Sequence, residues 1–230
     1  MYTILCIMTC RHFLKKNEWI TNVLGLREHK VRSNPLVSVE LTELRKKGIA
    51  AMITHLRLKA YGKINLALDV LGRRDNGYHD VRMIMQTVGL HDRIELYRTK
   101  EPGIRLETNL FYLPNNEQNL AYRAAALLME EFGVKEGVSI KLKKFIPVSA
   151  GMAGGSTDAA AVLFGVNKMF GLGLSIKELM ERGVKLGADI PYCLMRGTAL
   201  SEGIGEELTP LPQIPQCQVL IAKPGISVST

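Results

Sequence analysis

The chain has 230 residues, of which 47% are hydrophobic and 23% are charged, and its formal net charge at pH 7 is +8. These proportions are ordinary for a globular protein, so they exclude a disordered or collagen-like chain. No apolar stretch reaches the ~18 residues that a membrane span requires. The first residues also lack the cleavage site of a secretory signal, and we therefore expect a cytoplasmic protein without a membrane partner.

The positive charge is concentrated in residues 1–52. Nine Lys and Arg residues stand there against four acidic residues, whereas the remaining chain has 21 against 18. A nucleic-acid-binding domain usually gathers its basic residues on one face of the fold. We therefore expect a solvated basic segment and no nucleic-acid partner, with a basic RNA-binding module as the alternative.

Regular patterning begins just after Met52, and before it only residues 38–47 indicate a helix. Apolar residues alternate from Leu56 to Val70, which predicts a half-buried strand pair. Asn76-Gly77 is a turn signal, and residues 81–96 predict further strand, interrupted at residues 89–92.

Helices and strands are mixed in the second half of the chain. Asn119 can cap a helix that Gly133 ends, and residues 138–143 alternate as a strand. A helix is expected from about Ser156 to Phe170, closed by Gly171. The expected elements that follow are a helix starting with the capping box of Ser175 and Glu178 and running toward Gly187, and short strands at 198–201 and 218–222. This order predicts an α+β or mixed α/β fold with largely antiparallel strands.

The segment PVSAGMAGGSTDAA, residues 147–160, is the first candidate site. A strand end, glycines and a helix start would place free backbone N–H groups at the positive end of a helix dipole, which favours an anion. Ser156 or Thr157 could bind a phosphate or a metal ion. Gly155 stands where a P-loop has lysine, and the segment lacks the Gly-x-Gly of a dinucleotide fingerprint. The alternative is an ordinary turn capped by Ser156.

Other candidates carry charge or aromatic rings. Lys63 and Asn65 share one face of the first strand. Two interpretations of Lys63 are open: a solvated surface residue, or a cation that interacts with a phosphoryl group. Asp189 is a turn former or a carboxylate that orients or deprotonates a hydroxyl. Tyr78 and His79 lie on a turn, as surface residues or as a platform for a base.

Together, KAYGKINLALDVLGRRDNGYH, PVSAGMAGGSTDAAA and LGADIPYCLMRGTALSEGIGE resemble the GHMP small-molecule kinases. The resemblance covers residues 52–230. It implies a ribosomal-protein-S5-like N-terminal ATP-binding domain at 53–199 and the beginning of an incomplete C-terminal domain at 200–230. Residues 1–52 would be a non-family extension from a mis-assigned start, with 1–51 taking no part in the fold.

The resemblance also implies an activity, ATP-dependent phosphorylation of a small molecule with Mg²⁺. The GYH element points to the branch that phosphorylates the 2-hydroxyl of 4-diphosphocytidyl-2-C-methyl-D-erythritol in non-mevalonate isoprenoid biosynthesis. A mevalonate-like or sugar substrate is the alternative. Because family members continue for another quarter to a third of their length, the implied activity belongs to a complete protein, and this chain alone could lack it.

The resemblance assigns roles to the candidate residues. Asp189 would be the catalytic base and Lys63 would keep it ionised, while Asn65 would position the hydroxyl. Tyr78 would stack on cytosine and His79 would read its polar edge. Ser156 or Thr157 would lie nearest the metal, and Asn119 would flank adenine. The residues implied to wrap the triphosphate are Pro147, Ser149, Ala150, Gly151, Met152, Ala153, Gly154, Gly155, Ser156 and Thr157.

Overall fold

The structure is a computed structural model that describes residues 5–10, 53–75 and 77–222. Its framework is a pair of long antiparallel strands, β2 (His55–Arg73) and β3 (His79–Thr99). Around them lies a six-stranded sheet in which β4 (Gly103–Thr108), β5 (Gly137–Lys143), β3, β6 (Thr198–Glu202) and β7 (Glu207–Leu211) follow one another in space, with β2 also paired to β3. Within this sheet only β4 and β5 run parallel.

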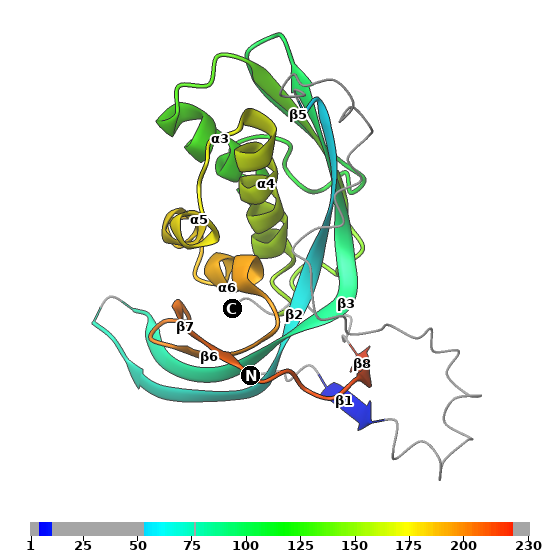
Figure 1. Cartoon of the computed structure of the whole chain (residues 1–230). Coiled ribbons are helices and arrows are strands. Elements are labelled where there is room, and N and C mark those ends of the chain that lie inside the picture. Colours follow the sequence, from blue (N-terminus) through cyan, green and yellow to red (C-terminus); the bar gives the residue numbers. More distant parts are fainter. Residues whose placement is uncertain (1–4, 11–52, 76, 223–230) are drawn as a thin grey trace, which may run out of the picture.

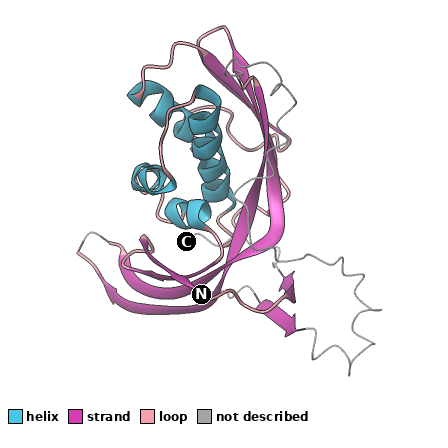
Figure 2. Cartoon of the chain, in the orientation of Figure 1, coloured by secondary structure: helices cyan, strands magenta, loops and turns pink. Residues whose placement is uncertain are grey.

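The helices cover one side of this sheet (Figures 1 and 2). They are α3 (Leu120–Glu131), α4 (Gly154–Phe170), α5 (Ile176–Gly183) and α6 (Ile190–Met195). Asn119 caps α3 by accepting a hydrogen bond from the Ala121 N–H. Ser175 and Glu178 form the predicted capping box of α5. The expected α+β fold with mostly antiparallel pairing is confirmed.

The core lies between the sheet and α4, which is central among the helices. Small residues on α4, including Ala159 and Ala160, are fully or almost fully buried. At Gly165 the approach is closest, because a Cβ there would lie 2.3 Å from Leu96 Cδ1 and 2.7 Å from Leu58 Cδ1. Glycine at this point therefore lets α4 lie directly on β2 and β3.

The structure corrects several boundaries. β3 is continuous through residues 89–92, where a break was expected. Helix α4 begins at Gly154, two residues before Ser156, with Ala153 in place of Ser156 as N-cap. Helix α5 ends at Gly183, well before Gly187. Strands β4 and β7 and helix α6 were not predicted.

The far end of β2 differs from the half-buried strand that its alternation predicts. Leu68 and Val70 are 39% and 54% exposed. Figure 1 shows why: the β2–β3 hairpin runs on past the helices and curves beneath them, so no helix covers this end. Alternation sets which side of a strand a residue faces, but burial requires a second layer on that side.

A second, two-stranded sheet joins β1 (Leu5–Cys10) to β8 (Cys217–Ala222) in antiparallel register. The sequence placed residues 1–51 outside the fold, whereas these six residues pair with β8. The helix expected at 38–47 lies outside the described residues.

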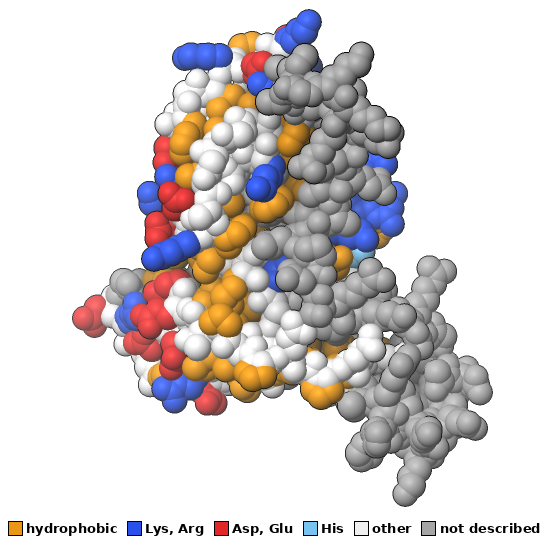
Figure 3. Space-filling model, viewed as in Figure 1, with side chains coloured by type: hydrophobic (Ala, Val, Ile, Leu, Met, Phe, Trp, Pro, Cys, Tyr) orange, Lys and Arg blue, Asp and Glu red, His pale blue; other side chains and the backbone are white. Residues whose placement is uncertain are grey.

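Ion pairs close the end of the β2–β3 hairpin, where acidic side chains gather (Figure 3). Arg74 donates to Asp80 Oδ1 through Nε at 2.9 Å and through Nη2 at 2.6 Å. Arg82 Nε lies 3.0 Å from Glu202 Oε1 on β6. The turn that carries Tyr78 is further fixed by the backbone, since the Arg74 N–H donates to the Tyr78 carbonyl at 2.8 Å.

The packing of α4 gives a stability prediction. Gly165→Ala gains about 1 kcal/mol of helix propensity, but the new methyl overlaps two buried leucines, and such overpacking costs about 1–3 kcal/mol. We expect a net loss of about 1 kcal/mol in the free energy of urea unfolding. In the control Gly187→Ala, which lies outside the helices, the atom nearest the new Cβ is Ile190 Cδ1 at 3.6 Å, an ordinary contact, so we expect no overpacking cost. Equal stability of the Gly165→Ala variant and the wild type would contradict this account of the helix–sheet contact.

Candidate functional site

Lys63 lies where the pairing of β2 and β3 is irregular. Tyr61 pairs with His91 and Lys63 pairs with Thr87, so Gly62 is opposed by the three residues 88–90. Beside this bulge, the Lys63 N–H donates to the Met152 carbonyl at 3.1 Å. Bulges commonly lie next to active sites because they redirect side chains. Here the bulge joins the sheet to the glycine-rich loop, which we define as residues 147–157.

Three of the predicted residues meet at this point. Lys63 Nζ donates to Asn65 Oδ1 at 3.0 Å and lies 3.7 Å from Asp189 Oδ2. The Lys63 side chain is 7% exposed and that of Asp189 is 32% exposed. Lys63 is therefore not a solvated residue at the edge of the sheet. A buried cation beside a partly open carboxylate can hold a hydroxyl and balance developing negative charge.

Helix α6 positions Asp189. Asp189 is its N-cap residue, but its side chain makes no capping hydrogen bond. The helix is anchored by Tyr192, whose hydroxyl donates to the Gly197 carbonyl at 2.7 Å, and by Ile190, which packs where a Cβ on Gly183 would come within 2.6 Å. The carboxylate is thus held by a rigid element and kept available for a ligand.

The glycine-rich loop has an unusual backbone. Ser149, Gly151 and Ala153 have φ values of 53°, 66° and 55°. Left-handed conformation costs a residue with a side chain about 1–2 kcal/mol, and such strain is concentrated at functional sites. Backbone turns of this kind, leading into a helix N-terminus, point N–H groups at one place and form an anion-binding nest.

The comparisons with known proteins agree with this geometry. Residues 119–197 match the model of the GHMP kinases N-terminal domain. Over 175 residues the chain is 61% identical to the 4-diphosphocytidyl-2-C-methyl-D-erythritol kinase of Lachnospira eligens, a match that covers 76% of this chain and 61% of that protein. The corresponding protein of Caldicellulosiruptor saccharolyticus is 58% identical over 173 residues, covering 75% and 60%.

Solved structures give the same result. A 4-(cytidine 5'-diphospho)-2C-methyl-D-erythritol kinase superposes with a TM-score of 0.59 at 37% identity, covering 67% of this chain and 55% of that one. The chain belongs to the GHMP kinases. It spans about three-fifths of the length of the curated relatives it matches. A homoserine kinase from Cytophaga hutchinsonii, 18% identical with a TM-score of 0.53 over 73% and 55% of the two chains, shows the shared fold alone.

The two hydroxyls at the start of α4 differ in this GHMP kinase. Thr157 is buried, and its Oγ1 donates to the Tyr61 carbonyl at 2.7 Å. Ser156 is half-buried, and its side chain makes no hydrogen bond within the described part of the chain. Of the two, Ser156 is the one whose hydroxyl is free for a ligand, while Thr157 fixes the helix to β2.

Tyr78 and His79 lie apart from Lys63 along the sheet. His79 pairs with Arg73 near the hairpin turn, whereas Lys63 pairs with Thr87. Both side chains are exposed. The structure therefore places them on the curved end of the hairpin, and a ligand that touched both Tyr78 and Asp189 would be an extended molecule.

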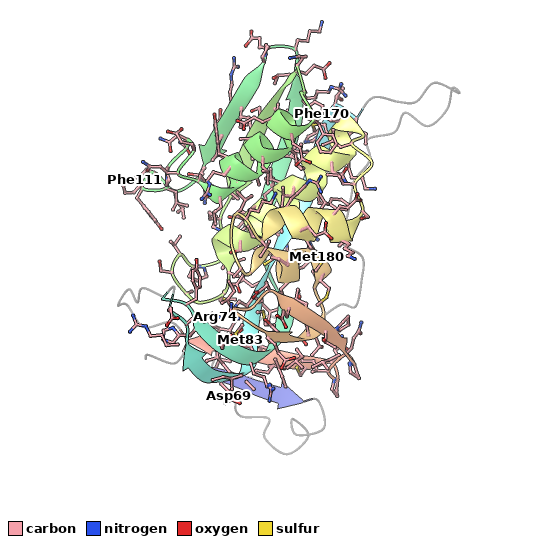
Figure 4. The ribbon with its side chains drawn as sticks, turned by 90° about the vertical axis from the view of Figure 1, so that its left-hand side faces the viewer. Asp69, Arg74, Met83, Phe111, Phe170 and Met180 are labelled. Carbon is pink, nitrogen blue, oxygen red and sulfur yellow. The ribbon has the colours of Figure 1, made fainter. Side chains whose placement is uncertain are left out.

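Asn119 shapes the protein at the other end of the site. Its Oδ1 accepts from the Ala121 N–H at 3.0 Å and its Nδ2 donates to the Pro114 carbonyl at 2.9 Å. Both ends of the amide are thus engaged. Its neighbour Leu120 reaches the glycine-rich loop, with Cδ1 3.5 Å from where a Cβ on Gly155 would stand. In the same segment Phe111 is fully exposed and projects away from the body (Figure 4).

Sequence reasoning missed a buried ion cluster beside this site, formed by Lys144, Asp92 and Asp158. Lys144 reads as part of an alternating basic strand, and Asp158 as a helix residue. A polar signal was available, since Asp158 stands directly before the apolar helix residues Ala159, Ala160 and Ala161 in the loop motif itself.

The two hydroxyls give a second stability prediction. Thr157→Val keeps the shape of the side chain but leaves the Tyr61 carbonyl without this donor, so we expect a loss of about 1–2 kcal/mol in unfolding free energy. Ser156→Ala serves as the control, because that hydroxyl bonds to no described residue, and its effect should stay within about 0.5 kcal/mol. Thermal and urea unfolding measure both. The reverse order of effects would contradict the assignment of the buried hydroxyl.

Proposed function

We propose that this GHMP kinase transfers the γ-phosphoryl group of ATP to the 2-hydroxyl of 4-diphosphocytidyl-2-C-methyl-D-erythritol. The observation that carries the proposal is the 3.7 Å approach of Lys63 Nζ to Asp189 Oδ2 beside the strained glycine-rich loop. The names of the relatives that are 51–61% identical support the choice of acceptor. Because the chain spans only part of those relatives, the activity is that of the complete protein.

The residues divide the reaction between them. Backbone N–H groups of the glycine-rich loop hold the phosphates, and Asp189 accepts the proton of the substrate hydroxyl. Lys63 balances charge on the transferring group, while Asn65, hydrogen-bonded to Lys63, orients the hydroxyl. Phosphoryl transfer depends mainly on positioning and charge stabilisation, so this small set of groups is sufficient.

Mg²⁺ fits this arrangement as a companion of ATP. No cluster of three or more His, Cys, Asp or Glu side chains that could hold a metal occurs among the described residues. Mg²⁺ bound with a nucleotide typically needs only one or two protein ligands, because phosphate oxygens and water complete its shell. The Ser156 hydroxyl, at the helix start, is the group that would contact it, and the ion would neutralise phosphate charge.

The acceptor is extended enough to use the hairpin. The cytosine end would reach Tyr78 and His79 on the curved part of β2–β3 while the erythritol hydroxyl lies at Asp189. Tyr78 would stack on the base and His79 would contact its polar edge.

No helix long and apolar enough to cross a membrane is found in the described residues.

The proposal is tested in a full-length setting. In a chimera, this chain's matching 175 residues replace those of the Lachnospira eligens protein. We expect the chimera to phosphorylate the diphosphocytidyl substrate in the presence of ATP and not to phosphorylate mevalonate. Mass spectrometry of the products measures both reactions. Phosphorylation of mevalonate instead would reject the proposed acceptor, and no transfer to either would reject the kinase assignment.

Two substitutions test the catalytic pair in that chimera. Asp189→Asn removes the base and should lower kcat by about 10²–10⁴-fold. Lys63→Met removes the charge while keeping the length of the side chain, and should lower kcat by about 10²–10³-fold. Asp69→Asn, an exposed carboxylate on the same strand, is the control and should leave kcat unchanged. Undiminished turnover in Asp189→Asn would exclude it as the base.

A further inference from the structure

The buried ion cluster joins three segments of the chain beneath the glycine-rich loop. Lys144 follows β5, Asp92 belongs to β3, and Asp158 lies near the start of α4. Lys144 Nζ donates to Asp92 Oδ2 and, at 2.6 Å, to Asp158 Oδ2. The three side chains are at most 5% exposed. A single ammonium group therefore links the sheet to both sides of the loop.

The entry to the loop is fixed by the same cluster. Asp92 Oδ1 accepts hydrogen bonds from the N–H groups of Phe145 at 2.5 Å and Ile146 at 2.8 Å. The backbone of Lys144 is held by Asn109, whose Oδ1 accepts from the Lys144 N–H at 2.7 Å. The exit of the loop is helix α4, which carries Asp158. The distance between entry and exit is thus set by Lys144.

The position of Lys144 is costly for stability. Its Nζ lies 3.1 Å from where a Cβ on Gly154 would stand, at the N-terminus of α4, where a cation is disfavoured by the helix dipole. Burial works against its charge, but Asp158 and Asp92 outweigh burial and raise the pKa of the ammonium group.

Asp158 adds a second cost. Burial raises the pKa of its carboxyl well above the ordinary range. Its Oδ1 is buried without a hydrogen-bond partner among the described residues. Buried ion pairs are often no more stabilising than apolar residues of similar volume. Stability alone therefore gives little reason for this cluster under an anion-binding loop.

We propose that Lys144 is a positioning residue of the nucleotide site, which, clasped by Asp92 and Asp158, holds the glycine-rich loop in its anion-binding conformation. The proposal rests on the proposed function, because it assigns the phosphates to this loop. Lys144 acts through the loop and does not contact the reacting atoms. The positive φ values of Ser149 and Ala153 are the strain that the clasp maintains.

The first measurement is amide hydrogen exchange of the chain without nucleotide. Lys144→Met should accelerate exchange of the amides of residues 149–153 at least about 10-fold and leave those of β3 and β4 unchanged. Asp158→Asn, which keeps an oxygen acceptor for Lys144 and resembles a protonated carboxyl, should stay within about threefold of the wild type. Unchanged loop exchange in Lys144→Met would overturn the positioning role.

The second measurement is ATP binding by calorimetry, made with the full-length chimera that tests the proposed function. Lys144→Met should weaken ATP binding at least about 10-fold, Asp158→Asn by less than about threefold, and the control Glu131→Gln, which breaks an ion pair with Arg182 between α3 and α5, not at all. Where Lys144→Met does not fold, Asp158→Ala, which leaves Lys144 paired with Asp92, takes its place with the same expected results. If the wild type binds ATP and Lys144→Met, or Asp158→Ala in its place, binds it equally well, only this inference fails. A wild type that binds no ATP overturns the proposed function as well.

Discussion

The antiparallel pairing of β2 with β3 is the constraint on which the rest of the structure depends. Every other strand of the main sheet attaches through β3, and α4 packs across both strands. At one place this pairing is irregular, and there the Lys63 N–H donates to the Met152 carbonyl. This hydrogen bond attaches the glycine-rich loop to the strand that carries the lysine.

The loop itself is held against strain from several directions. Ser149 and Ala153 adopt left-handed backbone conformations, at about 1–2 kcal/mol each. The hydrogen bond from Lys63, the bond from Thr157 to Tyr61 and the Lys144 cluster all bind the loop or its flanks to the sheet. These contacts offset the strain. A site organised in this way sacrifices some stability for binding.

Which features the sequence predicts depends on how far apart in the chain the interacting residues are. The caps of α3 and α5 rest on side chains that bond to backbone within three residues, so Asn119 and the Ser175–Glu178 pair could be recognised in advance. The short helix α6 has no such cap, and it was missed. Lys144 bonds to partners 52 and 14 positions away, which no local pattern reveals. Likewise, the burial of Lys63 depends on the loop and α6, and the exposure of Leu68 on where the helices stop.

The glycine-rich loop lacks the lysine that a P-loop carries, and two lysines outside the loop, Lys63 and Lys144, explain how it can do without one. A P-loop lysine both accompanies the phosphates and lies within the loop. In this protein Gly155 occupies that place, and Leu120 Cδ1 at the start of α3 lies 3.5 Å from the position of a Cβ, an ordinary van der Waals contact. Lys63, outside the loop, lies beside Asp189, where the proposed transfer would develop charge, and Lys144, beneath it, is closed off from solvent. If Lys63 supplies the charge for the proposed transfer and Lys144 holds the loop from beneath, the loop itself needs no lysine and can consist of small residues.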